Sequence, residues 1–287
     1  MADILTIIVT FDGMKWIDKC LRSLMSSVVA TDVVIVDNHS EDGTAQWVQE
    51  HFPNVPLFRN DDNIGFAAAN NMGFRYAITH GYKFIYLLNQ DAWIFPETFA
   101  TLTRVFATSE KYGILSPMQM VPNLSKQDAQ FHKHCGKAVG GSEEEVVDVP
   151  FVMAAHWMIT QECLQKVGGF SPAFPHYGED NDFINRSAYH GFHTAVVKTA
   201  MAVHDRSGRP RPKEYRMNLK NINARVAVAN PGKNAVASLL TQTCFLTAMG
   251  VIHFSTIPFK GIKEMWSSFK ELKNTRKLSQ KGEAFLD

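Results

Sequence analysis

Residues 84–91, FIYLLNQD, hold the pattern that decides the fold: an apolar run of strand length ends directly in Asn89, Gln90 and Asp91. Residues 4–9 (ILTIIV) and 33–36 (VVIV) repeat this largely apolar run, and each also ends in polar residues. Strands buried on both faces have this composition, and they are typical of parallel sheets that are covered by helices.

Apolar residues at helical spacing fill the intervals between these runs. The pattern predicts helices near residues 17–28, 45–52, 66–80 and 96–112, and further strands at 55–58 and 113–116. Strands and helices therefore alternate over the first 117 residues, which predicts an α/β fold with a mostly parallel sheet and helices on both faces. Ligands bind such sheets at the carboxyl ends of the strands, where the polar residues lie.

The remaining sequence is less regular. Residues 117–148 lose the periodicity and predict a loop or flap, and the pattern then resumes. We expect strands at 149–159 and 194–197 and helices at 161–167 and 179–190.

Composition limits the kinds of partner. The chain has 287 residues, 45% of them hydrophobic, with a formal net charge of +1, so we expect no nucleic-acid partner. Its four cysteines lie far apart, as in a cytoplasmic protein with reduced thiols. The N-terminus lacks a basic n-region, and no stretch reaches about 18 uninterrupted apolar residues, so neither a signal peptide nor a spanning helix is expected.

The polar strand ends suit a ligand with a nucleoside. Asp37 ends a buried strand at the ligand edge and can accept hydrogen bonds from a base or a ribose. Asn63 and Gly65 precede a helix whose first N–H groups are free, and Asn70 and Asn71 are unfavourable inside a helix. The alternative is that these residues form a turn or order the loop.

A diphosphate requires positive charge nearby. Asp91, with His204 as a second candidate, could bind Mg²⁺ or Mn²⁺, which prefer oxygen ligands and bridge phosphate groups. The alternatives are an Asx turn at the end of the strand and a histidine without a metal.

Three carboxylates cluster at Glu179, Asp180 and Asp182, where a helix is predicted to begin. One acidic residue suits a helix N-terminus for its dipole alone, but three repel one another. Because a like-charged neighbour raises the pKa of a carboxyl group, the cluster is a candidate general base.

These segments together resemble glycosyltransferase family 2 over residues 5–204. The matching segments, in order, are VTF, VDNHSEDGT, NIGFAAANNMG, LLNQD, VGGF and GEDNDFINR, followed by His204. The asparagine-rich third motif and LLNQD are most similar to the rhamnosyltransferase-like branch, which builds bacterial surface polysaccharides.

The resemblance implies an inverting enzyme of the GT-A fold. Residues 1–212 would form the catalytic domain, with a nucleotide-binding half (1–117) and an acceptor half (118–212), and residues 213–287 a helical C-terminal extension. The donor would be dTDP-rhamnose or a UDP-sugar, and the acceptor a saccharide or a lipid-linked saccharide.

The resemblance also implies roles for particular residues. Asp91 would be the main acid of the metal site beside His204, Asp180 the base beside Glu179, and Trp157 part of the acceptor side. The nucleotide-sugar would contact Thr10, Phe11, Asp12, Asp37, Asn63, Gly65, Asn70, Asn71, Asn89 and Gln90. Two positions depart from the family, because Asn89 replaces the first acid of its DxD motif and Phe11 replaces a frequent tyrosine.

The C-terminal extension has aromatic and aliphatic residues at helical spacing beside lysines and arginines. The apolar set comprises Phe259, Ile262, Met265, Trp266, Phe269 and Leu272. Such a basic amphipathic helix can lie in a membrane interface, or it can pack on the catalytic domain or on a second subunit. We therefore expect a cytoplasmic protein, with the inner face of the membrane as an alternative location.

Two other functions compete with the transferase. A sugar nucleotidyltransferase would carry a glycine-rich basic loop after the first strand, where this chain has FDGMKW. A catalytically silent nucleotide-sugar-binding protein would share the fold, but Asp91 and Asp180 favour an enzyme.

Overall fold

The computed structural model describes residues 2–206 and 212–286. In this part of the chain nine strands form one mixed sheet of order β3-β2-β1-β4-β8-β6-β9-β5, with β7 paired to β9. The strands are β1 (Ile4–Thr10), β2 (Thr31–Asp37), β3 (Leu57–Arg59), β4 (Phe84–Asn89), β5 (Ala92–Ile94), β6 (Tyr112–Met120), β7 (Val146–Asp148), β8 (His156–Thr160) and β9 (His193–His204). The strands β3, β2, β1 and β4 are parallel, whereas β8 runs antiparallel to both of its neighbours.

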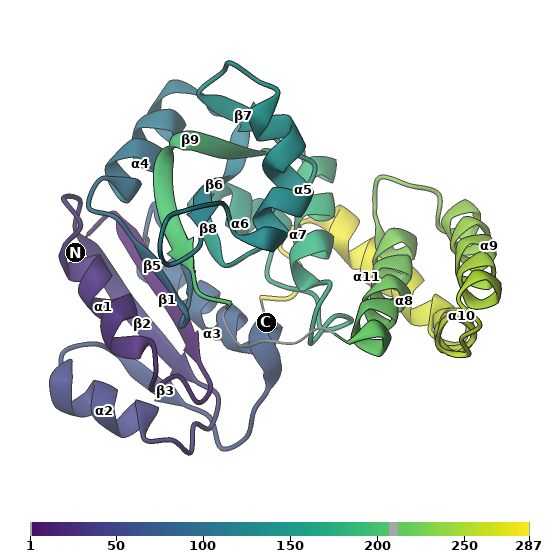
Figure 1. Ribbon diagram of the computed structural model, residues 1–287, viewed down its shortest axis with the longest axis horizontal. Helices are drawn as coiled ribbons and strands as arrows, with labels where there is room; N and C mark the ends of the chain where they lie inside the picture. The colour runs from purple at the N-terminus through teal and green to yellow at the C-terminus, as the bar shows by residue number, and fades with distance from the viewer. Residues whose placement is uncertain (1, 207–211, 287) are drawn as a thin grey trace.

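Helices cover both faces of this sheet, which confirms the predicted α/β class (Figure 1). In β1, Leu5 and Ile7 belong to one apolar cluster, and Ile4 and Ile8 belong to the other. This alternation is the two-residue period of a strand, and it explains why the run is apolar on both faces. One face packs against α3 (Gly65–Thr79), α5 (Ala129–Gly140), α6 (Gln161–Val167) and α7 (Glu179–Tyr189), and the other against α1 (Ile17–Met25), α2 (Thr44–His51) and α4 (Thr98–Thr108).

The sheet register places the polar strand ends at one edge. Thr10 of β1 is paired with Asp37 of β2, and Val9 is paired with Asn89 of β4. The carboxyl ends of these three parallel strands therefore form one surface, as the sequence predicts.

The prediction of a loop over residues 117–148 is wrong, because this segment contains the end of β6, helix α5 and strand β7. The carboxylate of Asp128 caps α5 by accepting the N–H groups of Gln130 and Phe131, and Phe131, Cys135 and Val139 are buried one turn apart. The predicted strand at 149–159 is shorter, beginning at His156, and Pro150 lies in the irregular part, where it has no N–H to donate to a ladder.

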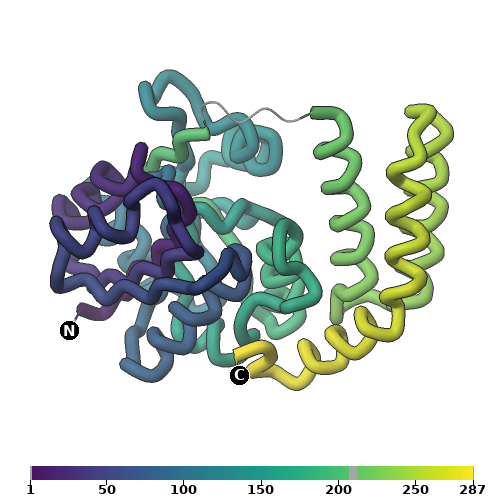
Figure 2. Tube along the Cα trace, turned by 90° about the horizontal axis from the view of Figure 1, so that it is seen from below, coloured from purple at the N-terminus to yellow at the C-terminus, as the bar shows by residue number. Residues whose placement is uncertain are grey.

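Four C-terminal helices form a separate layer beside the α/β part: α8 (Lys213–Ala229), α9 (Ala235–Ile252), α10 (Ile257–Ser267) and α11 (Phe269–Lys281) (Figure 2). A third apolar cluster joins them, and the loop between α6 and α7 contributes Ala173 and Phe174 to it. This loop therefore connects the helical layer to the α/β part.

The predicted membrane-facing stripe of the extension mostly packs inward. Met265 and Leu272 are fully buried, and Ile262 and Phe269 pack against the third cluster, because α8 and α9 present apolar surfaces to them. The predicted long helix is also divided, since α10 ends at Ser267 and α11 begins at Phe269. Four of the six side chains therefore pack inside the protein, mainly against the C-terminal helices themselves, whereas Phe259 and Trp266 are 44% and 49% exposed.

Helix α9 instead carries the exposed apolar surface. It is long and apolar enough to cross a membrane, with a mean hydropathy of 1.7, and only 17% of it is buried within the fold. The sequence criterion of an uninterrupted apolar run misses it because Ser238, Thr241 and Gln242 divide the segment. Length and composition alone are weak evidence for a membrane span.

The C-terminal segment returns to the α/β part beside the glycines of the VGGF motif (Figure 2). Gly168 pairs with Ala284, and a side chain at Gly168 would lie 1.8 Å from the Ala284 carbonyl oxygen. The glycine therefore permits a close backbone approach.

Candidate functional site

The predicted nucleoside-binding aspartate is fully buried between the ends of β1 and β2. Asp37 Oδ1 accepts hydrogen bonds from Thr10 Oγ1 (2.7 Å) and Ser40 Oγ (2.5 Å), and its Oδ2 accepts one from the Ser40 N–H (3.0 Å). Arg59 Nε lies 3.8 Å from Oδ2. In this structure Asp37 and Thr10 shape the loop at the strand ends, and contact with a nucleotide stays a prediction for both.

Gln90 holds the neighbouring loop. Its amide accepts the Phe11 N–H and donates to the Phe11 carbonyl oxygen, both at 2.9 Å, so this side chain fixes the backbone. The Phe11 side chain is 46% exposed at the same edge. Asp12 accepts the Glu41 N–H at 2.9 Å, which joins this loop to the one after β2.

The asparagine-rich motif is mainly structural. Asn63 Oδ1 accepts the Gly65 N–H at 3.0 Å, and a side chain at Gly65 would lie 2.8 Å from the Pro175 carbonyl oxygen. Asn71 accepts the Phe170 N–H and donates to the Phe170 carbonyl oxygen, which agrees with the alternative that it orders a loop, and its contact with a nucleotide stays a prediction. Asn70 is buried and donates to the Phe66 carbonyl within α3.

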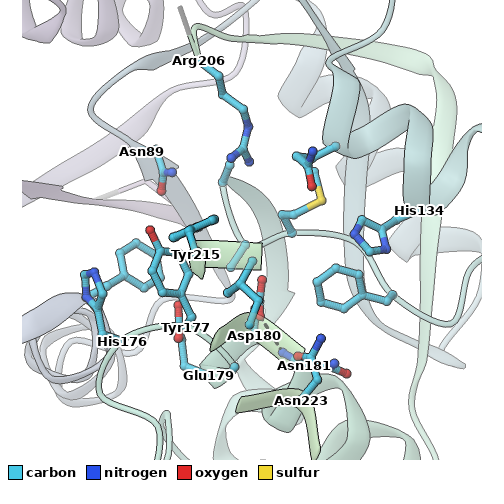
Figure 3. Close-up of a pocket in the computed structure, with 18 residues that line it drawn as sticks. Asn89, His134, His176, Tyr177, Glu179, Asp180, Asn181, Arg206, Tyr215 and Asn223 are labelled. Carbon is cyan, nitrogen blue, oxygen red and sulfur yellow. Dashed lines mark hydrogen bonds between the residues drawn. The ribbon is translucent and has the colours of Figure 1, made fainter. Parts of the chain in front are cut away.

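A cleft of about 500 Å³ lies between the sheet edge, α7 and α8 (Figure 3). Three predicted site residues line it: Asn89, Glu179 and Asp180. The other lining residues are Phe66, Gln130, His134, Phe151, Met153, Ala154, Ala155, His176, Tyr177, Gly178, Asn181, Arg206, Tyr215, Leu219 and Asn223. The candidate base therefore lies in the same cavity as the end of β4.

Glu179 and Asp180 differ in their surroundings although they are adjacent. Burial raises the pKa of Glu179, and the neighbouring carboxylates of Asp180 and Asp182 raise it further. Among the described residues, no hydrogen-bond donor reaches Glu179 Oε2. This carboxyl group is therefore held in its protonated form at neutral pH.

Burial also raises the pKa of Asp180, but several groups stabilise its charged form. The N–H groups of Asn181 and Ala154 donate to its carboxylate, and the positive charge of Arg206 lowers the pKa in part. Asp180 is therefore the more acidic of the pair and the better candidate for a base near neutral pH.

The third carboxylate has a structural partner. Asp182 Oδ2 accepts a hydrogen bond from Arg186 Nε at 2.8 Å, and both side chains are buried. Arg186 also donates to the carbonyl oxygens of Val167 and Gly169, so this pair anchors α7 against the VGGF loop.

Asp91 and His204 lie together, each two residues along the chain from a residue that lines the cleft, Asn89 and Arg206 respectively. His204 Nε2 is 3.4 Å from Asp91 Oδ1, and both side chains are buried. Burial lowers the pKa of His204, which favours the neutral imidazole that binds metals.

This pair fits a divalent cation that is held mainly by phosphate. No group of three His, Cys, Asp or Glu side chains suited to a metal occurs within residues 2–206 and 212–286. Mg²⁺ and similar ions often take one or two protein ligands together with substrate phosphates and water. A buried carboxylate beside a neutral imidazole provides such a partial set.

The prediction that Trp157 lies on the acceptor side is wrong. Its indole is fully buried, donates to the Val152 carbonyl oxygen at 3.1 Å and packs against Phe170 and Phe183. Alternation along β8 turns this side chain into the core, and the preceding irregular segment (153–155) lines the cleft instead.

Sequence reasoning missed several cleft residues. The Nε atom of Arg206 lies 3.3 Å from Asp128 Oδ2. Arg206 follows the metal-ligand candidate His204 by two positions, and this spacing was the only feature of the sequence that pointed to it. Tyr215 and Asn223 come from α8, and no pattern in the sequence places that helix at the cleft.

The chain is similar to two curated proteins that are named a hexosyltransferase and a mannosyltransferase. It is 24% identical over 214 residues to the low-salt glycan biosynthesis hexosyltransferase Agl10 of Haloferax volcanii, a match that covers 71% of this chain and 68% of that protein. It is 28% identical over 110 residues to the undecaprenyl-phosphate mannosyltransferase of Micrococcus luteus, covering 37% of this chain and 45% of that protein.

Solved structures of low identity share the fold. S. aureus TarS (residues 1–349) superposes with a TM-score of 0.62 at 14% identity, covering 96% of this chain and 90% of that chain. The mannosyltransferase PcManGT from Pyrobaculum calidifontis, in complex with GDP-Man and Mn²⁺, gives a TM-score of 0.58 at 16% identity, covering 97% and 87%.

The family model of glycosyl transferase family 2 matches residues 6–167, which is more than half of the chain. This range contains most of β1, the parallel strands β2 to β4 and the segment Asn89–Asp91 at the end of β4. Residues of this range, among them Asn89, line the cleft together with the carboxylate pair Glu179 and Asp180, which lies beyond it. The chain therefore belongs to glycosyl transferase family 2 and is a nucleotide-sugar-dependent glycosyltransferase with the GT-A fold.

Proposed function

We propose that this enzyme transfers a hexose or 6-deoxyhexose from a nucleoside diphosphate donor to a hydroxyl group of a saccharide, with inversion at the anomeric carbon. The observation that carries the proposal is the position of Asp180. It lines a substrate-sized cleft at the start of α7, with Asn89 and Arg206 at the same cavity. A base there can meet an acceptor while the donor lies at the sheet edge.

The proposed step is a direct displacement. Asp180 accepts the proton of the acceptor hydroxyl as its oxygen bonds to the anomeric carbon, and the bond from that carbon to the phosphate oxygen breaks. The nucleoside diphosphate leaves with the electron pair. A base of raised pKa suits this proton transfer near neutral pH.

Asp91 and His204 would hold a divalent cation at the diphosphate. Such a cation offsets the negative charge on the leaving group. Arg206 provides a further positive charge at the cleft wall. Asn89, which replaces a carboxylate, leaves the site with less negative charge, so we expect metal affinity to be modest.

The names of the two relatives suggest which donors and acceptors to test. One is a hexosyltransferase of glycan biosynthesis and one an undecaprenyl-phosphate mannosyltransferase, which supports a role in surface polysaccharide synthesis with a lipid-linked acceptor. The rhamnosyltransferase-like motifs make dTDP-rhamnose the first donor to test and a UDP-sugar the second. We propose a cytoplasmic location, at the inner face of the membrane.

A donor panel tests this function. The full chain is incubated with dTDP-rhamnose, UDP-glucose, UDP-GlcNAc or GDP-mannose and Mn²⁺, and release of the nucleoside diphosphate is measured over hours. Release from one donor, lost in Asp180→Asn, supports the proposal. Nucleotide binding without release from any donor would identify a silent binding protein.

The membrane contact is proposed on a different surface from the one the sequence indicated. The uncharged helix α9 and the turn after it expose large apolar side chains, namely Val236, Leu240, Phe245, Val251, Ile252 and Phe254, the last 97% exposed. The exposed Lys260 and Lys263 of α10 lie nearby in the chain and suit anionic headgroups.

Vesicle sedimentation tests this contact. We expect the wild type to sediment with vesicles of phosphatidylcholine that contain one quarter phosphatidylglycerol. The double variant Ile252→Ser with Phe254→Ser should stay in the supernatant. The control replaces Met25 and Val28, which are 72% and 59% exposed on the α/β part. Equal binding by both double variants would refute the contact.

A further inference from the structure

The cleft contains aromatic side chains that the proposed chemistry does not use. Tyr177 precedes Gly178 and Glu179 and is 43% exposed. His176 and Tyr215 also line the cleft (Figure 3). The rings of Tyr177 and Tyr215 meet edge to face at 5.5 Å.

The backbone holds Tyr177 in an uncommon conformation. Its φ of 66° lies in the left-handed region, which costs free energy for a residue other than glycine. The surrounding loop is held on both sides. A side chain at Gly178 would lie 2.7 Å from Ile222 of α8, and Phe174 is buried in the cluster of the C-terminal helices. The exposed ring is therefore fixed by packing on α8.

Helix α8 also supplies polar groups to the same space. Tyr215, Leu219 and Asn223 line the cleft from α8, and Asn181 lines it from α7. Amide and phenol groups match the donors and acceptors of sugar hydroxyls, whereas an aromatic face suits the apolar C–H face of a pyranose ring. The wall thus combines the two kinds of contact that a saccharide needs.

We propose that Tyr177, with Tyr215 and Asn223 of α8, forms the acceptor subsite, in which a pyranose ring of the acceptor packs on the Tyr177 ring beside Asp180. The C-terminal helices thereby complete the active site. This inference rests on the proposed function and identifies the acceptor-binding residues for it.

The test uses methyl pyranosides as acceptor probes. They carry no aromatic group, so any binding that depends on Tyr177 comes from the sugar ring itself. Saturation-transfer NMR is recorded on the full chain with methyl gluco-, galacto-, manno- and rhamnopyranosides, in the presence of Mn²⁺ and the nucleotide that binds best. We expect at least one probe to bind, with its ring C–H protons receiving the strongest transfer.

Three variants locate the contact. Tyr177→Gly, which relieves the left-handed strain and so keeps the fold, should weaken probe binding at least about fivefold. Tyr177→Phe keeps the ring and should bind within about twofold of wild type. Tyr189→Ala is the matched control, since Tyr189 is also 43% exposed but does not line the cleft.

Unchanged binding by Tyr177→Gly, or no probe binding to the wild type, would overturn the subsite. Nucleotide thermal shifts and donor hydrolysis are measured on the same samples. If these persist while no probe binds, the acceptor subsite fails and the transferase proposal stands. If no nucleotide binds and no donor is hydrolysed, the transferase proposal itself fails.

Discussion

Two adjacent isosteric substitutions should have very different effects on turnover. Asp180→Asn removes the carboxylate that receives two backbone N–H groups and lines the cleft. A general base contributes about 10²–10⁴-fold, so the turnover number should fall by that factor, which corresponds to about 3–5 kcal/mol in the activation free energy. Glu179→Gln replaces a carboxyl group that burial already keeps protonated, so we expect a loss of less than about tenfold.

The pH profile separates these roles further. Because the pKa of Asp180 is raised, the wild-type rate should decline on acidification at a pH well above the ordinary aspartate value of about 4. The rate of Glu179→Gln should show the same decline at acidic pH. The residual rate of Asp180→Asn should not show it.

The assay is steady-state release of nucleoside diphosphate across pH 4.5 to 9, with nucleotide affinity measured for each variant to show that the donor site is intact. If Glu179→Gln is as inactive as Asp180→Asn, the assignment of the base to Asp180 alone is refuted.

Two further predictions concern the packing that supports the cleft. Arg186→Met leaves the buried Asp182 carboxylate without its partner, so the free energy of unfolding should fall by about 3–5 kcal/mol, measured by urea denaturation. Gly168→Ala places a methyl group 1.8 Å from the Ala284 carbonyl oxygen at a φ of 88°, so it should displace segment 283–286 and increase its cleavage in limited proteolysis.

Arg186→Met and Gly168→Ala each have a matched control. Arg22→Met breaks an exposed ion pair with Asp18 and should cost less than about 1 kcal/mol. Gly140→Ala adds a methyl group where no atom lies within 4 Å. Equal stability losses in Arg186→Met and Arg22→Met, or equal cleavage in the two glycine variants, would contradict the packing described above.

The features that local patterns encode could be predicted from the sequence. Thr10, Asp37 and Asn89 end apolar runs, and parallel strands bring such ends to one edge without further information. Helix α5 was missed even though Phe131, Cys135 and Val139 have helical spacing, because the polar residues between them obscured the pattern.

The features that depend on distant contacts could not be predicted. The sequence does not show that Asn71 holds the backbone of Phe170, because the two residues lie far apart in the chain. Residues 262–272 have the same amphipathic pattern whether they face lipid or the helices α8 and α9. Tyr177 and Tyr215 meet only because the loop before α7 packs into the C-terminal helices.

The measurement that tests the central claim most directly is a thermal-shift panel of UDP, dTDP, GDP and CDP, each with and without Mn²⁺, on the wild type and Asp91→Asn. Ligand at ten times its dissociation constant should stabilise the wild type by about 1.4 kcal/mol, which raises the melting temperature by a few degrees, on the order of 3 °C. We predict a Mn²⁺-dependent shift with one nucleotide that is lost in Asp91→Asn. If no nucleotide at millimolar concentration shifts the wild type, the claim of a nucleotide-sugar site at the Asp91–His204 pair is contradicted.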